Sequence, residues 1–256
     1  MSKLKTNIFY DSWIMFKRCL LTSMRNPEAL VMATVTPFFL MFLFGAVFGN
    51  IANVGDYNYI DFIIPGIILQ SVAQAAQYSA INVTTDMTKG IIDRFRSMPI
   101  SKFAVLIGHT GAGVVRNTIT TTVIISTAFI LGFRPRGSVS GWLIAVGFII
   151  LIIIAMSLIA VLCGLISKTA EGSSGLMFPL FILPFISSGF APTDTMTGFI
   201  KTFAELQPMT PIIDSIRALM LGMPADDSIW VALAWCVGTI IITFVCAAQF
   251  YKRKLQ

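Results

Sequence analysis

The sequence predicts an all-α integral membrane protein with six transmembrane helices. Of its 256 residues, 56% are hydrophobic and only 12% are charged, which is about half the charged share of a soluble domain. Six apolar segments are long enough to cross the hydrocarbon core of a bilayer, which takes about 20 helical residues. Because no water inside the bilayer can bind unpaired backbone groups, these segments should be helices.

The six predicted spans follow one another along the chain, so we expect a single transmembrane domain over residues 1–256. They cover residues 29–48, 62–85, 103–133, 137–167, 172–193 and 228–251. Five of them contain no charged side chain, whereas the third contains His109 and Arg116.

Before the first span, residues 1–27 are expected to form a cytoplasmic amphipathic helix. Large apolar side chains recur at helical spacing with basic residues between them: Ile8, Phe9, Trp13, Phe16, Leu20 and Met24, interleaved with Lys17, Arg18 and Arg25. This pattern is typical of a helix that lies in the plane of the membrane interface. An ordinary helix packed against the protein would share the pattern.

The positive charge of the chain, +6 in total, indicates its orientation. With successive loops assigned to alternate sides, 13 Lys and Arg residues fall on the side of the two termini and four on the other, while Arg116 lies in a span. Positively charged loops stay in the cytoplasm, so we expect a cell-membrane protein with both termini cytoplasmic. Topology and contact with lipid headgroups explain the basic residues, and no nucleic acid partner is expected.

Polar side chains within two spans are candidates for a polar pathway or a helix interface. Gln70, Gln74 and Gln77 share one face of the second span, and Asn82 follows them. Such residues turn away from lipid, toward protein or a water-filled cavity. Interhelical hydrogen bonding and the lining of a pathway both fit the glutamines, and a structural and a functional role are likewise open for Arg116.

The loop of residues 86–102 combines an apolar face with a charged one. At helical spacing, one side would carry Ile91, Ile92, Phe95 and Met98, and the other Asp93, Arg94, Arg96 and Ser97. Pro99 should end this helix, since proline restricts the residue before it. A short apolar stripe edged by charge suits a helix that binds in the groove of a partner. It could also pack on the membrane surface or on the chain's own helices.

On the opposite side, residues 191–227 should form two short amphipathic helices before the last span. The first is indicated by Met196, Phe199, Ile200, Phe203 and Leu206, and the second by Ile212, Ile213, Ile216, Leu219 and Met220. Pro208 and Pro211 separate the two helices, and Gly222 should end the second.

The sequence offers no catalytic constellation. It contains neither a G-x-x-x-x-G-K-[ST] phosphate loop nor a G-x-S-x-G nucleophile motif. His109 is its only histidine, and the four cysteines, Cys19, Cys163, Cys236 and Cys246, show no paired spacing. We therefore expect no metal site, no disulfide, no bound cofactor and no enzymatic activity in this chain.

Three segments resemble the ABC type-2 export permeases, especially their daunorubicin-resistance-like branch. In the 86–102 loop the similar positions are Asp86, Gly90, Ile92, Asp93, Arg94, Phe95, Arg96, Ser97, Met98 and Pro99. The others are residues 187–193 and an outer-loop pattern with the candidate residues Glu205, Pro208, Pro211, Asp214 and Arg217. Arg116 lies where the branch often has Arg, whereas His109 replaces a common Arg or Lys.

The resemblance implies the transmembrane subunit of an ATP-driven exporter that has no ATPase of its own. Two such chains, identical or paralogous, would form the pathway. The 86–98 region, Ile91 included, would be a coupling helix in a groove of a separate ATPase subunit, present in two copies. That subunit would bind ATP and Mg²⁺. The cargo would be a hydrophobic or amphipathic compound: drug-like, lipid or peptide.

Other functions stay open at this stage. A related permease could export a lipid-linked glycan or a lantibiotic-type peptide, because fold does not fix cargo. An ion-driven secondary transporter often needs carboxylates inside its spans, and the six predicted spans contain none. A multi-pass membrane enzyme would need a catalytic cluster, which the sequence does not offer.

Overall fold

The structure, a computed structural model, describes residues 8–25, 27–49, 58–90, 103–224 and 227–254. In these ranges the chain forms helices and no strand. In order, they are α1 (Ile8–Met24), α2 (Pro27–Phe48), α3 (Tyr59–Thr88), α5 (Ala104–Ile130), α6 (Val139–Ile166), α7 (Ala170–Ile182), η1 (Leu183–Ile186), η2 (Thr193–Thr195), α8 (Gly198–Leu206), α9 (Met209–Leu221) and α10 (Ser228–Lys254).

Four helices of the described ranges are long and apolar enough to cross a membrane. They are α3, α5, α6 and residues Ser228–Tyr251 of α10, and they match the second, third, fourth and sixth predicted spans. Helix α2 covers the first predicted span, and its part Val35–Phe48 is apolar. In the fifth predicted span the apolar helical stretch is shorter, Ala170–Ile186. Pro179 lies inside α7, and the 3₁₀ turn η1 follows it, so the fifth segment does not continue as one regular helix.

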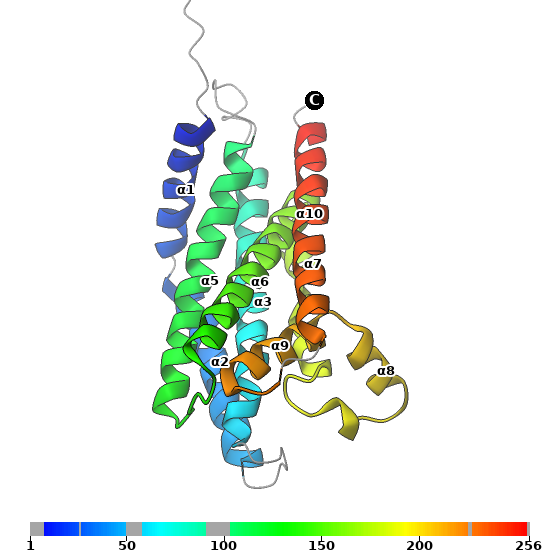
Figure 1. Ribbon diagram of the computed structural model, residues 1–256. Helices are drawn as coiled ribbons and strands as arrows, with labels where there is room; N and C mark the ends of the chain where they lie inside the picture. The colour runs from blue at the N-terminus through cyan, green and yellow to red at the C-terminus, as the bar shows by residue number, and fades with distance from the viewer. Residues whose placement is uncertain (1–7, 26, 50–57, 91–102, 225–226, 255–256) are drawn as a thin grey trace, which may run out of the picture.

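Helix α3 lies in the middle of the bundle and packs against α2, α5, α6 and α7 (Figure 1). All of its residues from Ile63 to Leu69 are buried, and the isoleucine and leucine side chains among them are completely buried. Helix α10 packs on α6 and α9 at the other side of the bundle. The start of α1 and the end of α10 lie at the same end, which we call the inner end, and the opposite end is the outer end (Figure 1).

Large apolar side chains cover much of the outside of the bundle. Phe39 and Phe42 of α2 and Trp230 and Ile242 of α10 are all more than half exposed. A soluble monomer rarely exposes apolar surface on this scale, whereas lipid accepts it without cost. The exposed surface therefore agrees with an integral membrane protein.

The predicted N-terminal helix is present, but its direction differs from the prediction. Helix α1 runs beside the first half of α5 instead of lying across the inner end of the bundle (Figure 1). Gly108 permits this contact, because a Cβ at that position would lie 2.7 Å from Met15 Cβ. The helix buries Cys19 and Ser23 and exposes Phe9 and other apolar residues, which is the polarity expected of a helix in contact with lipid.

Two short helices, α8 and α9, lie in the segment for which two outer helices were predicted. Helix α9 lies across the outer end and packs on α3, α6 and α10 (Figure 1), and its apolar side chains, such as Ile213 and Ile216, are buried. It ends at Gly222 as predicted, since that residue takes the left-handed conformation with φ of 73°. Helix α8 projects from the bundle and exposes Phe199 and Leu206.

Candidate functional site

The inner end of α3 leads directly into the predicted coupling segment. Helix α3 ends at Thr88, and Gly90 has a φ of 66°, a left-handed conformation that glycine adopts freely. The chain therefore turns sharply at Gly90, just after the end of α3. The remaining predicted coupling residues lie outside the described ranges: Ile91, Ile92, Asp93, Arg94, Phe95, Arg96, Met98 and Pro99.

Asp86, the first predicted coupling residue, binds within the bundle and joins three helices. Both of its carboxylate oxygens accept hydrogen bonds from the Arg18 guanidinium of α1, at 3.0 and 3.2 Å. His109 of α5 brings its Nε2 to 3.3 Å from Asp86 Oδ2, within ion-pair distance but without hydrogen-bond alignment. Asp86 is 15% exposed and His109 7%. This cluster, Arg18–Asp86–His109, fixes α1 to α3 and α5 at the inner end.

Cys19 lies beside the same cluster. Its sulfur, one oxygen of Asp86 and one nitrogen of His109 all lie within 4.8 Å of one another, a spacing that a metal ion would tolerate. However, the Arg18 guanidinium binds both oxygens of Asp86, and its positive charge opposes a divalent cation on the same carboxylate. We therefore interpret the arrangement as an ion-pair cluster with a thiol next to it.

Arg116 is buried between three helices, with only 5% of its surface exposed. Its guanidinium donates to Ser23 Oγ of α1 at 2.9 Å, to the Ala75 carbonyl of α3 at 2.8 Å, and to Ser79 Oγ. None of the described carboxylates forms an ion pair with Arg116, and its Nε has no hydrogen-bond partner in the described ranges. The guanidinium is thus bound by neutral acceptors and has no counter-ion among the described side chains.

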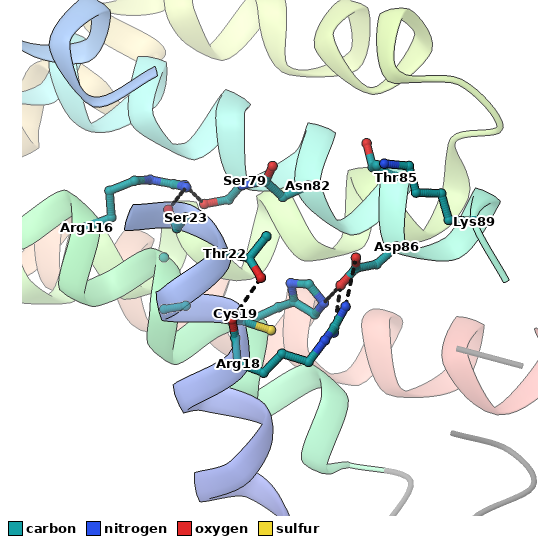
Figure 2. Close-up of a pocket in the computed structure, with 13 residues that line it drawn as sticks. Arg18, Cys19, Thr22, Ser23, Ser79, Asn82, Thr85, Asp86, Lys89 and Arg116 are labelled. Carbon is teal, nitrogen blue, oxygen red and sulfur yellow. Dashed lines mark hydrogen bonds and ion pairs between the residues drawn. The ribbon is translucent and has the colours of Figure 1, made fainter. Parts of the chain in front are cut away.

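A polar cavity of about 180 Å³ connects Arg116 with the Arg18–Asp86–His109 cluster (Figure 2). Helices α1, α3 and α5 all contribute to its wall. Its functional groups include Arg18, Ser23, Asn82, Lys89, His109 and Arg116. This cavity, which we call the inner cavity, contains two of the predicted pathway or interface residues, Asn82 and Arg116.

The predicted glutamine face points elsewhere. Gln77 donates to the hydroxyl and carbonyl of Ser174 on α7, at 2.6 and 3.2 Å, so interhelical hydrogen bonding is confirmed for this residue. Gln70 is fully buried, and its amide has no partner among the described residues. At about 100° per residue, Asn82 lies roughly 80–140° around α3 from the three glutamines. The two sets therefore do not form one surface.

At the outer end, Arg217 connects α9 with α3 and with the turn that follows η1. It donates to Asp214 Oδ1 at 2.6 Å, to the Phe62 carbonyl at 3.1 Å and to the Ser188 carbonyl, and it stacks on the Phe62 ring. Asp214 also accepts from the Ser188 hydroxyl at 2.6 Å. Burial lowers the pKa of Arg217 to about 10, so the guanidinium stays charged at neutral pH.

The other predicted outer-loop residues have simpler roles. Glu205 lies 3.9 Å from Lys201 in an exposed ion pair. Pro208 caps the start of α9, and Pro211 lies in its first turn, where a proline costs no internal hydrogen bond.

The partners of Asp86 and Arg116 could not be predicted from the sequence. Arg18 and Asp86 are 68 positions apart, and Ser23 and Arg116 are 93 apart, so spacing carries no information about these pairs. One signal was present in α1, where Ser12, Cys19 and Ser23 share one face of the helix and are buried. Small polar residues on a lipid-contacting helix indicate a face turned toward protein.

Comparison with known proteins places these features in a family. A model of the ABC-2 type transporter family matches residues 10–221. The chain is 26% identical over 241 residues to the daunorubicin resistance ABC transporter permease protein DrrB1 of Streptomyces coeruleorubidus, covering 93% of this chain and 84% of that protein.

Two further relatives have similar coverage. The probable doxorubicin resistance ABC transporter permease protein DrrC of Mycobacterium tuberculosis (strain CDC 1551 / Oshkosh) is 25% identical over 90% of this chain and 83% of its own length. The inner membrane transport permease YadH of Escherichia coli (strain K12) is 27% identical over 84% of each chain. The family match takes in most of the sequence and confirms the resemblance, so the protein belongs to the ABC-2 type transporter family.

Proposed function

We propose that this chain is the transmembrane subunit of an ATP-driven exporter and that a separate subunit hydrolyses the ATP. The observation that carries the proposal is the family match over residues 10–221 in a sequence without a phosphate-binding loop. ATP and Mg²⁺ are then bound by the partner, and this chain contributes membrane helices and a docking segment.

The docking segment is residues 86–102, with Ile91, Ile92, Phe95 and Met98 as the face that enters a groove on the ATPase. Its position supports this role, because it follows the inner end of α3, the most buried helix of the bundle. A movement of the segment would act directly on Asp86. Through Arg18 and His109 the same movement would reach α1 and α5.

Two copies of the chain, or this chain and a paralogue, form the pathway in this proposal, with two ATPase subunits on the cytoplasmic side. Closure of the ATPase pair shifts the membrane helices between two states, and the cargo leaves as the populations change. Both termini lie in the cytoplasm in this proposal, since α1 begins and α10 ends at the inner end (Figure 1) and most Lys and Arg residues of the sequence fall on the side of the termini. The cargo is a hydrophobic or amphipathic compound, for which the two relatives named for anthracycline resistance are the supporting observation.

The proposal is tested by co-expressing the chain with its ATPase and measuring how much ATPase co-purifies. Phe95→Asp should remove most of the bound ATPase, because truncating one large anchor of a helix in a groove costs about 2 kcal/mol or more, and a buried charge adds to that loss. The matched control is Phe199→Asp on α8, which is 82% exposed at the outer end. Unchanged co-purification and export with Phe95→Asp would exclude the proposed docking face.

A further inference from the structure

Helix α8 presents an apolar face that the described part of the chain leaves uncovered. The side chains on this face are between 38% and 82% exposed: Phe199, Ile200, Phe203 and Leu206. At about 100° per residue, these four side chains fall within about 120° of the helix circumference. Ala204 is completely buried and faces the bundle instead. The helix thus has one side on the protein and a separate apolar side turned away from it.

The charged side chains of α8 lie on a third side of the helix. At the same spacing, Lys201 and Glu205 lie roughly 150–170° from the middle of the apolar face. Lys201 lies 3.6 Å from Asp194 and 3.9 Å from Glu205, and both carboxylates are exposed. These groups favour water, whereas large apolar side chains are costly to expose to water. The boundary of a bilayer offers water to one side of a short helix and hydrocarbon to the other.

Helix α8 is attached to the bundle at the depth of the membrane. Gln207, which follows its last residue, donates from Nε2 to the carbonyls of Leu183 and Ile186 in η1, at 3.1 and 2.7 Å. The turn after η1 packs closely on α3, because a Cβ at Gly66 would lie 2.6 Å from the Gly189 carbonyl oxygen. Gly66 lies inside the second predicted span, roughly 6 Å along the helix from its start. The end of α8 is therefore fixed near the outer boundary of the hydrocarbon.

An exposed tryptophan indicates the same boundary on another part of the bundle. Trp230 lies in the first turn of α10 and is 70% exposed. Tryptophan is enriched where the hydrocarbon meets the lipid headgroups, so the start of α10 is expected at that level. Figure 1 shows α8 beside the bundle at about the level of the start of α10. A helix that projects sideways from the bundle at this level meets lipid.

We propose that the apolar face of α8 binds the acyl chains of phospholipids in the leaflet at the outer end. Its four apolar side chains enter the hydrocarbon, and the charged side chains stay among headgroups and water. This face continues the lipid-covered surface of the bundle onto the outer loop. The contact holds that loop against the membrane. It is independent of the proposed export function, because the ATPase docks at the opposite end of the bundle.

The contact is tested by photo-crosslinking of the full-length chain in phosphatidylcholine liposomes. The variant is Phe203→p-benzoylphenylalanine, whose side chain forms a covalent bond on illumination with a C–H group that it touches. We expect products in which the chain gains the mass of one phospholipid, measured by mass spectrometry. The matched control is Glu205→p-benzoylphenylalanine, two residues away on the charged side, where the native side chain is 49% exposed. Lipid adducts should fall to the background level at this position.

A second variant tests the same face if the first does not fold. Leu206→p-benzoylphenylalanine changes a side chain that is 73% exposed, and it should give the same lipid adducts. A covalent dimer of the chain in place of lipid adducts would overturn the proposal and identify the face as an interface between two copies. Equal lipid adducts at Phe203 and Glu205, or none at Phe203 and Leu206, would also overturn it. Since no ATPase is present, these outcomes leave the proposed export function untouched.

Discussion

Replacing Arg217 with methionine should loosen the outer end of the bundle. The guanidinium is 6% exposed and bonds the carbonyls of Phe62 and Ser188. Methionine replaces part of the apolar volume but cannot donate to either carbonyl. Leaving a buried acceptor without its donor costs about 1–3 kcal/mol, and the lost contact with the Phe62 ring adds about 0.5–1 kcal/mol.

The ion pair with Asp214 adds little to this sum. The Asp214 side chain is 40% exposed, and water screens exposed pairs to a median of about 0–1 kcal/mol. The expected loss for Arg217→Met is therefore about 3 kcal/mol, with the two carbonyls as the main contribution. For a protein of this size that corresponds to a fall in unfolding temperature of roughly 6–12 °C.

The assay is thermal unfolding of the purified chain in lipid nanodiscs, followed by tryptophan fluorescence. The matched control is Lys201→Met on α8. Lys201 is 39% exposed and lies 3.6 Å from Asp194 and 3.9 Å from Glu205, so its loss should change stability by less than about 1 kcal/mol. If Arg217→Met unfolds at the same temperature as Lys201→Met, the contacts of Arg217 at the outer end contribute no measurable stability, contrary to the prediction.

Three further predictions concern α1, the ion-pair cluster and the orientation. Gly108→Ala should lower the unfolding temperature, since its Cβ would lie 2.7 Å from Met15 Cβ and overpacking costs about 1–3 kcal/mol. A double-mutant cycle of Arg18→Gln and Asp86→Asn should show a coupling of about 0.5–3 kcal/mol. In intact cells, a membrane-impermeant thiol reagent should label a single cysteine at Thr195 and not one at Ser97.

The control for Gly108→Ala is the same substitution at Gly147 on α6. Gly147→Ala has no neighbour within 4 Å of the new Cβ and should stabilise α6 by up to about 1 kcal/mol. Equal effects at Gly108 and Gly147 would exclude a close contact between α1 and α5. A coupling near zero would show that Arg18 and Asp86 do not interact energetically. Labelling only at Ser97 would show that the chain has the opposite orientation.

The sequence predicted best those helices whose spacing pattern and end signals lie within one segment. The spacing of apolar residues and the positions of Pro208 and Gly222 predicted α8 and α9, and the chain forms both helices there. Long apolar segments likewise predicted the four long helices. Each of these features depends on residues within about 30 positions of one another, so local propensity and hydrophobic burial are enough to determine them.

The inner cavity could not be predicted, because its residues meet only after α1 packs on α5. Asp86 was assigned to ATPase coupling because its segment resembles the loop of the ABC type-2 export permeases, and in the structure it binds Arg18 and lies against His109. Asn82 was grouped with the glutamines because it is near them in sequence. Its position on the helix separates it from them by roughly 80–140°. Packing between distant segments, which spacing does not encode, decided the case of Asp86, whereas the position of Asn82 follows from helical spacing alone.

The most direct test of the central claim is transport in proteoliposomes containing this chain with its ATPase, with an anthracycline as the probe. We predict ATP-dependent movement of the probe that requires both proteins and is lost with Phe95→Asp but not with Phe199→Asp. The chain alone should neither hydrolyse ATP nor move the probe when an ion gradient is imposed. Transport by the chain alone, driven by a proton or sodium gradient, would contradict the account and identify a secondary transporter instead.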